Sequence, residues 1–168
     1  MNGIILKMEN YQGVSPVKIL NTHFRHAQEH EGLVYYSTDI MFNTYDSKRK
    51  KPKAKPDSVI FFLKVAGKDG LSNMFVQADL VSWASGKDAF IPGDASTFSP
   101  AAYVNEPKKT WLKLFNLRLV DTAYIDTLVF TGQNGQTRPL IDVISQPRVN
   151  RAYWDDAAIS CEGDLINL

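Results

Sequence analysis

Residues 59–83 read VIFFLKVAGKDGLSNMFVQADLVSW, two apolar runs separated by a segment rich in glycine and polar residues. The first run, residues 59–65, is almost continuously apolar, which is typical of a buried strand. In the second run, Met74, Val76, Ala78 and Leu80 fall at every second position and would share one face of a strand. With residues 67–73 as the turn, this part of the chain predicts a β-hairpin.

The segments around this hairpin predict further strands and one helix. A Ser-Pro pair starts the helix predicted for residues 16–31, and Gly32 ends it. Its apolar face, by helical spacing, is Val17, Leu20, Phe24 and Ala27. Runs rich in β-forming residues predict strands at 3–8, 33–38, 111–120, 128–130 and 139–144. About six strands and one clear helix indicate the α+β class, with a mixed or antiparallel sheet curled into a small barrel and helices outside it.

The length of 168 residues and a hydrophobic content of 44% are average for one folded domain. We expect a single domain over residues 1–154 and an acidic C-terminal tail over residues 155–168. No apolar run approaches the ~20 residues that a bilayer requires, and the N-terminus lacks the basic and apolar regions of a secretory signal. Cys161 is the single cysteine. A cytoplasmic protein with no membrane partner is therefore expected.

The net charge of +1 hides an uneven distribution. Six of the 19 basic residues lie within residues 48–55, so the remaining 13 face 18 acidic residues, a balance of −5. Such a run releases counterions when it contacts phosphates, although it is also compatible with a solubilising loop. The candidate phosphate-binding residues are Lys48, Arg49, Lys50, Lys51, Lys53 and, outside the run, Arg148.

The residues available for metal or catalytic chemistry are few. One cysteine and three histidines exclude cysteine-based zinc modules and four-cysteine iron–sulfur clusters. His23, His26 and His30 share one sector of the predicted helix, but without a HExxH pattern they are interpreted as solvated helix surface and not as a metal site. No nucleophile elbow, phosphate loop or dinucleotide fingerprint occurs. No metal, cofactor or catalytic residue is predicted.

Several aromatic residues lie at strand ends or in residues 84–109, which we expect to be a long irregular segment of functional importance. Aromatic rings in such places can stack on a nucleobase, although core packing is the more common role of each one. The candidates from this group are Tyr35, Tyr36, Trp83, Phe98 and Tyr103.

Five segments, taken in order, carry a resemblance to a known family. They are IILKMEN near the N-terminus, LVYYSTD, the hairpin segment of residues 58–82, TWLKLFNLRLVD and NGQTRPLIDVISQ. In this order and spacing, over about residues 3–148, the chain resembles the YTH domain and the related EVE modules, which have a PUA-like fold. That resemblance implies a PUA-like curled sheet and a reader of modified bases in nucleic acid.

The resemblance also implies a cage of aromatic or large apolar side chains around a flipped modified base. Its first member corresponds to Tyr36, or to Tyr35 if the register slips by one residue, with Ser37 at the base edge. The second corresponds to Phe98 or, next, to Tyr103. Trp83 is a further alternative and Lys7 a further base-binding candidate. The chain departs from the family pattern at three places, with Tyr for Trp in the cage, Glu9 for an amide, and Ile144-Ser145 for an Arg-Asp pair.

These considerations favour a non-enzymatic module that binds nucleic acid carrying a modified base, with methylation as the expected modification and DNA favoured over RNA. In prokaryotes, similar modules read the target in modification-dependent restriction systems, so a fused or separate motor or nuclease subunit is an expected partner. Two other classes stay open: a PUA-like enzyme acting on nucleic acid, and a protein-interaction module such as an antitoxin or phage inhibitor. Metal dependence would separate the enzyme from the reader, and weak salt dependence would indicate the protein-interaction module.

Overall fold

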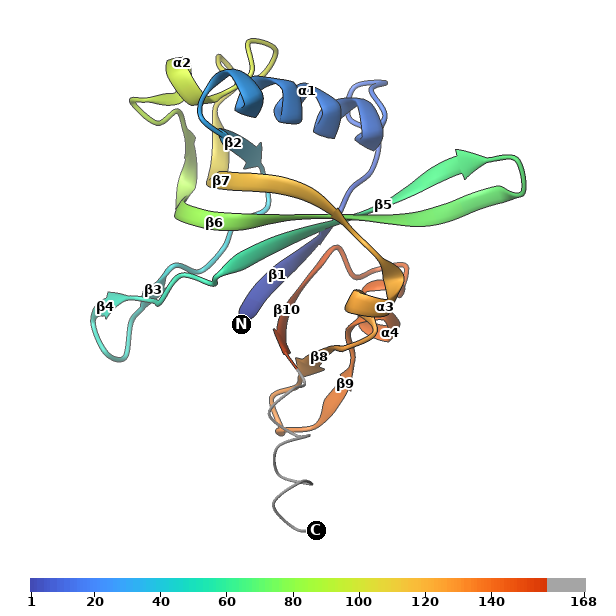
Figure 1. The fold of residues 1–168 in the computed structure, drawn as a ribbon. Coiled ribbons are helices and arrows are strands. Elements are labelled where there is room, and N and C mark those ends of the chain that lie inside the picture. Colours follow the sequence, from blue (N-terminus) through green and yellow to red (C-terminus); the bar gives the residue numbers. More distant parts are fainter. Residues whose placement is uncertain (157–168) are drawn as a thin grey trace.

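A computed structural model describes residues 1–156, and its main feature is an open, mixed sheet of eight strands in the order β2-β7-β6-β5-β1-β10-β8-β9 (Figure 1). The strands are β1 (Asn2–Lys7), β2 (Leu33–Thr38), β5 (Ser58–Gly67), β6 (Gly70–Phe90), β7 (Lys108–Val120), β8 (Leu128–Thr131), β9 (Thr137–Pro139) and β10 (Arg151–Asp156). Neighbouring strands are antiparallel except β1 and β5, which are parallel.

The predicted hairpin is confirmed as β5 and β6 at the middle of the sheet. Alternate side chains of β5 enter different apolar clusters, Phe61 on the α1 face and Phe62 on the other. Phe62 stacks on Phe75 of β6 at 5.2 Å between ring centroids. The nearly continuous apolar run of residues 59–65 is therefore explained, because both faces of β5 are buried.

Helix α1 (Pro16–Glu29) covers one face of the sheet (Figure 1). The side chain of Ser15 accepts a hydrogen bond from the backbone N–H of Lys18, as an N-cap should. After the helix, Gly32 takes φ +84° and its N–H donates to the carbonyl of Ala27, which ends the helix. The predicted packing face is wrong in one respect, because Phe24 is 43% exposed. Ile19 and His23 are buried instead, so the buried stripe is rotated around the helix axis.

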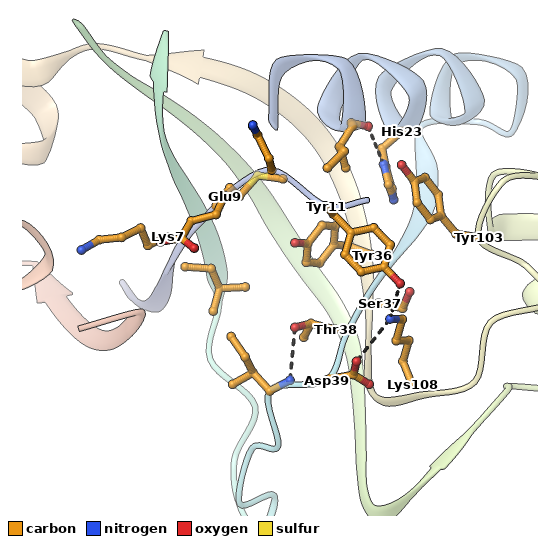
Figure 2. Close-up of a pocket in the computed structure, with 15 residues that line it drawn as sticks. Lys7, Glu9, Tyr11, His23, Tyr36, Ser37, Thr38, Asp39, Tyr103 and Lys108 are labelled. Atoms are coloured by element: carbon orange, nitrogen blue, oxygen red, sulfur yellow. Dashed lines mark hydrogen bonds and ion pairs between the residues drawn. The ribbon is translucent and has the colours of Figure 1, made fainter. Parts of the chain in front are cut away.

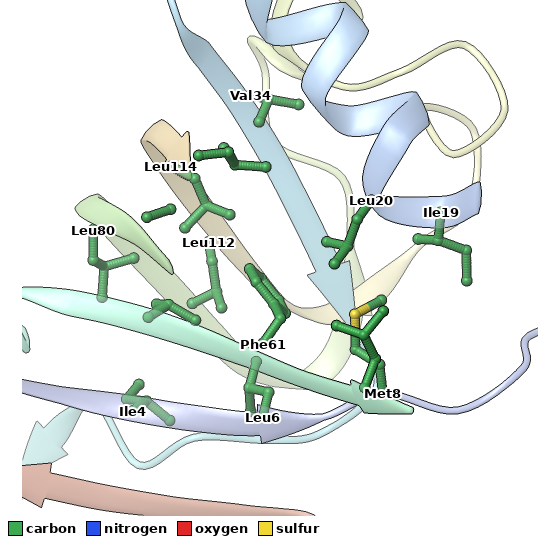
Figure 3. Packing of buried hydrophobic residues seen from close by; sticks show 14 of the residues in the cluster. Ile4, Leu6, Met8, Ile19, Leu20, Val34, Phe61, Leu80, Leu112 and Leu114 are labelled. Carbon is green, nitrogen blue, oxygen red and sulfur yellow. The ribbon is translucent and has the colours of Figure 1, made fainter. Parts of the chain in front are cut away.

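The core on the α1 face is built from alternate strand residues and the buried stripe of α1 (Figure 3). Leu6 and Phe61, from the parallel pair β1 and β5, are cross-strand partners, and Leu112 of β7 belongs to the same cluster. Three members of this cluster, Leu6, Met8 and Ile19, also line the cavity described in the next section.

The other face is covered by the short helices α3 (Thr122–Ile125) and α4 (Leu140–Ile144). The strand predicted for residues 139–144 is wrong: β9 ends at Pro139 and α4 follows, burying Leu140 and Ile144. The expected start of a tail at Asp155 is also wrong, because β10 runs to Asp156 between β1 and β8. The rest of the expected acidic tail, residues 157–168, lies outside the described residues.

The irregular segment expected for residues 84–109 is shorter than predicted. Strand β6 continues to Phe90 through three irregularities in its register with β7, and β7 begins at Lys108. Such bulges bend and twist a strand, which allows one strand of 21 residues to follow the curvature of the sheet. The short helix α2 (Ala95–Phe98) lies in the remaining connection.

The structure thus confirms an α+β protein with a mixed sheet, while the count of eight strands exceeds the expected six. Within residues 1–156 the sheet does not close into a barrel, since β2 and β9 remain at its two edges. A separate two-stranded hairpin, β3 (Tyr45–Asp46) and β4 (Lys51–Pro52), projects from the sheet (Figure 1). No helix in this part of the chain is long and apolar enough to span a membrane.

Candidate functional site

A cavity of about 430 Å³ lies where the end of β1, the end of β2 and helix α1 meet. The connection between α2 and β7 closes one side of it (Figure 2). Its volume is in the range of small-molecule sites in proteins. The lining residues are Leu6, Lys7, Met8, Glu9, Asn10, Tyr11, Ile19, His23, Tyr36, Ser37, Thr38, Asp39, Ile40, Tyr103 and Lys108.

Tyr36 is the aromatic residue of β2 that points toward α1. Its ring packs against Phe61 at 4.7 Å and against His23 at 5.5 Å between centroids, so core residues fix its orientation. Burial, with a smaller contribution from Tyr103, raises the pKa of the Tyr36 phenol to about 12. The hydroxyl is therefore protonated at neutral pH and can donate a hydrogen bond to a ligand.

His23 lies behind Tyr36 on α1 and is 3% exposed. Its Nδ1 lies 2.7 Å from the carbonyl oxygen of Ile19, one helical turn earlier. Desolvation by burial is the largest cause that lowers the pKa of His23 to about 4, opposed by that hydrogen bond and assisted by the charge of His26. The imidazole is thus neutral at physiological pH, and the interpretation of His23 as solvated helix surface is wrong.

Tyr103 provides a second aromatic wall from the connection that precedes β7. Its ring stacks on His23 with centroids 5.2 Å apart and an interplanar angle of 26°. Tyr103 is partly exposed, in contrast to His23. The two stacked rings and Tyr36 form a continuous aromatic corner of the cavity (Figure 2).

Tyr11 and Lys108 form a polar edge of the cavity beside the aromatic corner (Figure 2). A tight turn with positive φ at Gln12 and Gly13 directs the chain so that Tyr11 pairs with Val14. The Nζ of Lys108 donates to the Tyr11 hydroxyl at 2.9 Å and lies 3.3 Å from a carboxylate oxygen of Asp39. Burial opposes the charge of Lys108, but these two partners outweigh it and raise the lysine pKa. Lys108 is therefore a fixed cation at the rim.

Four of the residues predicted to bind a base line this cavity: Lys7, Tyr36, Ser37 and Tyr103. Their arrangement differs from the expectation for Lys7, whose ammonium points away from the aromatic corner and donates to the carbonyl of Gln146 at 2.8 Å (Figure 2). Only the stem of Lys7 faces the cavity.

Tyr35 and Phe98 lie elsewhere, because successive residues of a strand point to opposite faces. Tyr35 packs edge-on against Trp111 and Phe98, and its hydroxyl donates to Asp94 at 2.7 Å. Lys113 also donates to Asp94, at 3.1 Å, so the polar groups of this cluster have partners. The expected pairing of Tyr36 with Phe98 is therefore replaced in the structure by the proximity of Tyr36 and Tyr103.

Trp83 lines a different, smaller cleft of about 260 Å³ at the start of β1. Lys53, a predicted phosphate-binding residue, and the half-exposed Tyr153 line the same cleft. On β1, Gly3 lines this cleft and Lys7 lines the cavity. The two residues are four positions apart, and a strand rises ~3.3 Å per residue, so ~13 Å of strand separates the cleft from the cavity.

The predicted phosphate-binding residues are all exposed, and most of them lie on or beside the β3–β4 hairpin. Nε of Arg49 lies 3.8 Å from Oδ2 of Asp46, so these two residues form an ion pair. Within residues 1–156, Lys48, Lys50, Lys51 and Lys53 have no ion pair or side-chain hydrogen bond, so their charges are available to a polyanion. Arg148 lies separately, beyond α4.

The cavity is acidic compared with this hairpin. Glu9 and Asp39 line it together with Lys7 and Lys108, and Glu106 accepts a hydrogen bond from Tyr11 at its rim. A phosphate group would meet unfavourable carboxylates here, whereas a neutral ring with N–H groups would not. The structure thus separates an aromatic cavity from a basic projection.

Three residues that build the cavity were not among the predicted candidates: Tyr11, His23 and Lys108. The helical spacing placed His23 beside the apolar face, which could have indicated burial. No sequence signal brings Lys108 and Tyr11 together, since they are 97 positions apart and meet only through the sheet topology.

Comparisons with family models, curated proteins and solved structures found no match to this chain. Among residues 1–156, no group of three or more histidine, cysteine, aspartate or glutamate side chains is arranged to hold a metal ion.

Proposed function

We propose that this chain is a non-enzymatic module that binds nucleic acid and takes one modified base into the cavity of Tyr36 and Tyr103. The observation that carries the proposal is the aromatic corner itself. It joins two predicted cage residues to a buried neutral histidine in a cavity large enough for a small ring system.

The energetics of base flipping support this use of the cavity. Removing a base from its stack costs a few kcal/mol, and stacking on an aromatic side chain returns ~1–3 kcal/mol. Burying an added methyl group contributes about 0.8 kcal/mol more. The aromatic corner thus roughly offsets the flip and favours the modified base, while other contacts must supply most of the affinity.

The β3–β4 hairpin is proposed as the source of that affinity. Lys53, directly after β4, lines the cleft of Trp83, and ~13 Å of strand β1 separates that cleft from the cavity. Because one strand of duplex DNA advances 3.4 Å per nucleotide, a strand that follows β1 from the cavity would place a phosphate at this cleft about four nucleotides from the flipped base. Phosphate contacts carry no base information and would act on every sequence alike.

The type of module is proposed from the sequence resemblance to the YTH and EVE families. The proposal includes a PUA-like module of the YTH or EVE type, in the cytoplasm. It would be the target-reading part of a modification-dependent restriction system, with a motor or nuclease as a fused or separate partner. The mixed sheet and the cavity between its strands and α1 are compatible with such a module.

The test is a binding panel at one salt concentration, with duplexes and single strands that carry unmodified, adenine-methylated or cytosine-modified sites. Tyr103→Ala should lower affinity for the preferred modified probe by ~5- to 150-fold and affect the unmodified probe less. Phe98→Ala is the matched control, because Phe98 lies near the same connection but packs on the Tyr35 side.

Two results would overturn the proposal. The first is equal affinity of the wild-type protein for modified and unmodified probes. The second is a Tyr103→Ala protein that folds normally and keeps the full wild-type preference. The preferred probe is then measured again at higher salt, where binding that does not weaken would instead favour a protein-interaction module.

A further inference from the structure

The buried His23 has one ring nitrogen without a partner. The carbonyl of Ile19 can only accept a hydrogen bond, so Nδ1 of His23 carries the proton that it donates there. In the neutral ring, Nε2 then has a free lone pair and can only accept. Within residues 1–156, no donor lies at hydrogen-bond distance from Nε2. Figure 2 shows this nitrogen directed toward the space beside Tyr103 and Tyr36.

We propose that His23 determines which base enters the cavity, because its Nε2 accepts a hydrogen bond from the exocyclic amine of an adenine or cytosine base. This inference rests on the proposed function and names the substrate class of the same cavity. His23 would touch the base directly, whereas Tyr36 and Tyr103 supply the stacking surface.

The choice of an amine follows from the groups that each base presents. At C6 of a purine or C4 of a pyrimidine, adenine and cytosine carry an exocyclic N–H donor, whereas guanine and thymine carry an oxygen acceptor. Guanine and thymine also have N–H groups on the same edge, so the proposed selection requires that this exocyclic position faces Nε2. An oxygen opposite the lone pair of Nε2 would leave both acceptors without a hydrogen and would be disfavoured.

The surroundings of the cavity support a donor ligand. Asp39 already accepts from Lys108, and Glu106 accepts from Tyr11, so these carboxylates are engaged at the rim. Within residues 1–156, Nε2 of His23 is an acceptor in the aromatic corner without a partner, and the carboxylate of Glu9 is a further acceptor that lines the cavity. A monomethylated amine keeps one N–H for this nitrogen and directs its methyl group elsewhere in the cavity.

The experiment uses matched DNA probes that differ only at one base: adenine, N6-methyladenine and N6,N6-dimethyladenine, with the corresponding three cytosine probes. Dimethylation removes the last N–H while keeping the ring. Affinities are measured for the wild type, for His23→Phe, which keeps an aromatic ring but lacks an acceptor, and for His23→Gln, which keeps an acceptor.

The wild-type protein should bind a monomethylated probe ~5- to 150-fold more tightly than its dimethylated counterpart, the range for loss of a buried hydrogen bond. His23→Phe should bind both alike, and His23→Gln should recover part of the difference. If His23→Phe does not fold, ¹⁵N NMR of wild-type histidine replaces it. The Nε2 signal should then shift with the monomethylated probe and not with the dimethylated one.

The possible failures are distinct. If the wild type and His23→Phe both prefer the monomethylated probe, the second methyl group is excluded by its size and the role of His23 is refuted. If the wild type binds both methylated probes equally but more tightly than unmodified DNA, the role of His23 also falls while the proposed function stands. If no modified probe is preferred, the proposed function falls, and this inference falls with it.

Discussion

Acidification should destabilise this protein through His23, and the variant His23→Gln should reveal how much. In the folded chain the pKa of His23 is lowered to about 4, chiefly by burial, whereas the ordinary value is 6.5. Between these two values the unfolded chain binds a proton that the folded chain does not. The free energy of unfolding must therefore fall as the pH falls through this window.

The magnitude follows from the difference between the two pKa values. Each pKa unit corresponds to 1.36 kcal/mol, and near pH 4 the folded histidine is about half protonated, so His23 should cost about 3 kcal/mol of stability there. Because the side chain is 3% exposed, solvent does not screen this effect appreciably. Glutamine does not titrate, so the variant should lack this loss.

The assay is urea unfolding of both proteins near neutral pH and near pH 4, and the quantity of interest is the difference between them. The titratable groups that share the cavity with His23 are Lys7, Glu9, Tyr11, Tyr36, Asp39, Tyr103 and Lys108, and His26 lies on the same helix. Both proteins contain these groups, so their direct contributions cancel. An equal loss of stability on acidification in both proteins would refute the assignment of His23 as a buried neutral imidazole.

Three further predictions concern other parts of the molecule. Changing residues 48–51 together to glutamine should lower the affinity for nucleic acid equally for all sequences. It should also reduce the slope of log affinity against log salt by ~0.9 for each duplex phosphate that the hairpin no longer neutralises. An unchanged slope, or the same effect from Lys68→Gln at the β5–β6 turn, would make the hairpin a solubilising loop. Tyr35→Ala should lower stability by ~3–5 kcal/mol in thermal unfolding, as loss of a buried aromatic side chain does, and weaken every probe alike; a selective loss of modified-base binding would return Tyr35 to the cage. Gly3→Ala should lower the free energy of unfolding by ~1–3 kcal/mol, because the added methyl group would overlap the Trp154 indole. Gly93→Ala should be nearly neutral, because no atom lies near its added methyl group. Equal melting temperatures of the two variants would contradict this packing.

Local patterns alone predicted the elements whose signals are complete within a few residues. The period of two in residues 74–80, the apolar run of residues 59–65 and the Ser15-Pro16 start of α1 each gave the correct element, because side-chain alternation and capping depend on nearby residues. Tyr36 was predicted as a cage residue from the family resemblance and not from a local pattern, and the choice between Tyr35 and Tyr36 depended on the register.

The three-dimensional packing decided the rest. Leu140 and Ile144 lie in a short helix and not in a strand, because they complete an apolar cluster that includes Ile5 and Trp154 from strands far apart in the sequence. β10 forms because both of its edges find partners in β1 and β8, which no local pattern in residues 151–156 announces.

The same division holds for the candidate site. The sequence by itself determined that aromatic residues lie at the end of β2 and in the connection before β7, and that one basic segment stands apart from a mildly acidic remainder. Only the tertiary structure decided that Tyr103 and not Phe98 meets Tyr36, and that the helix residue His23 becomes buried and neutral. The physical reason is that these contacts join segments separated by many residues, and burial by distant segments sets both the neighbours of a side chain and its pKa.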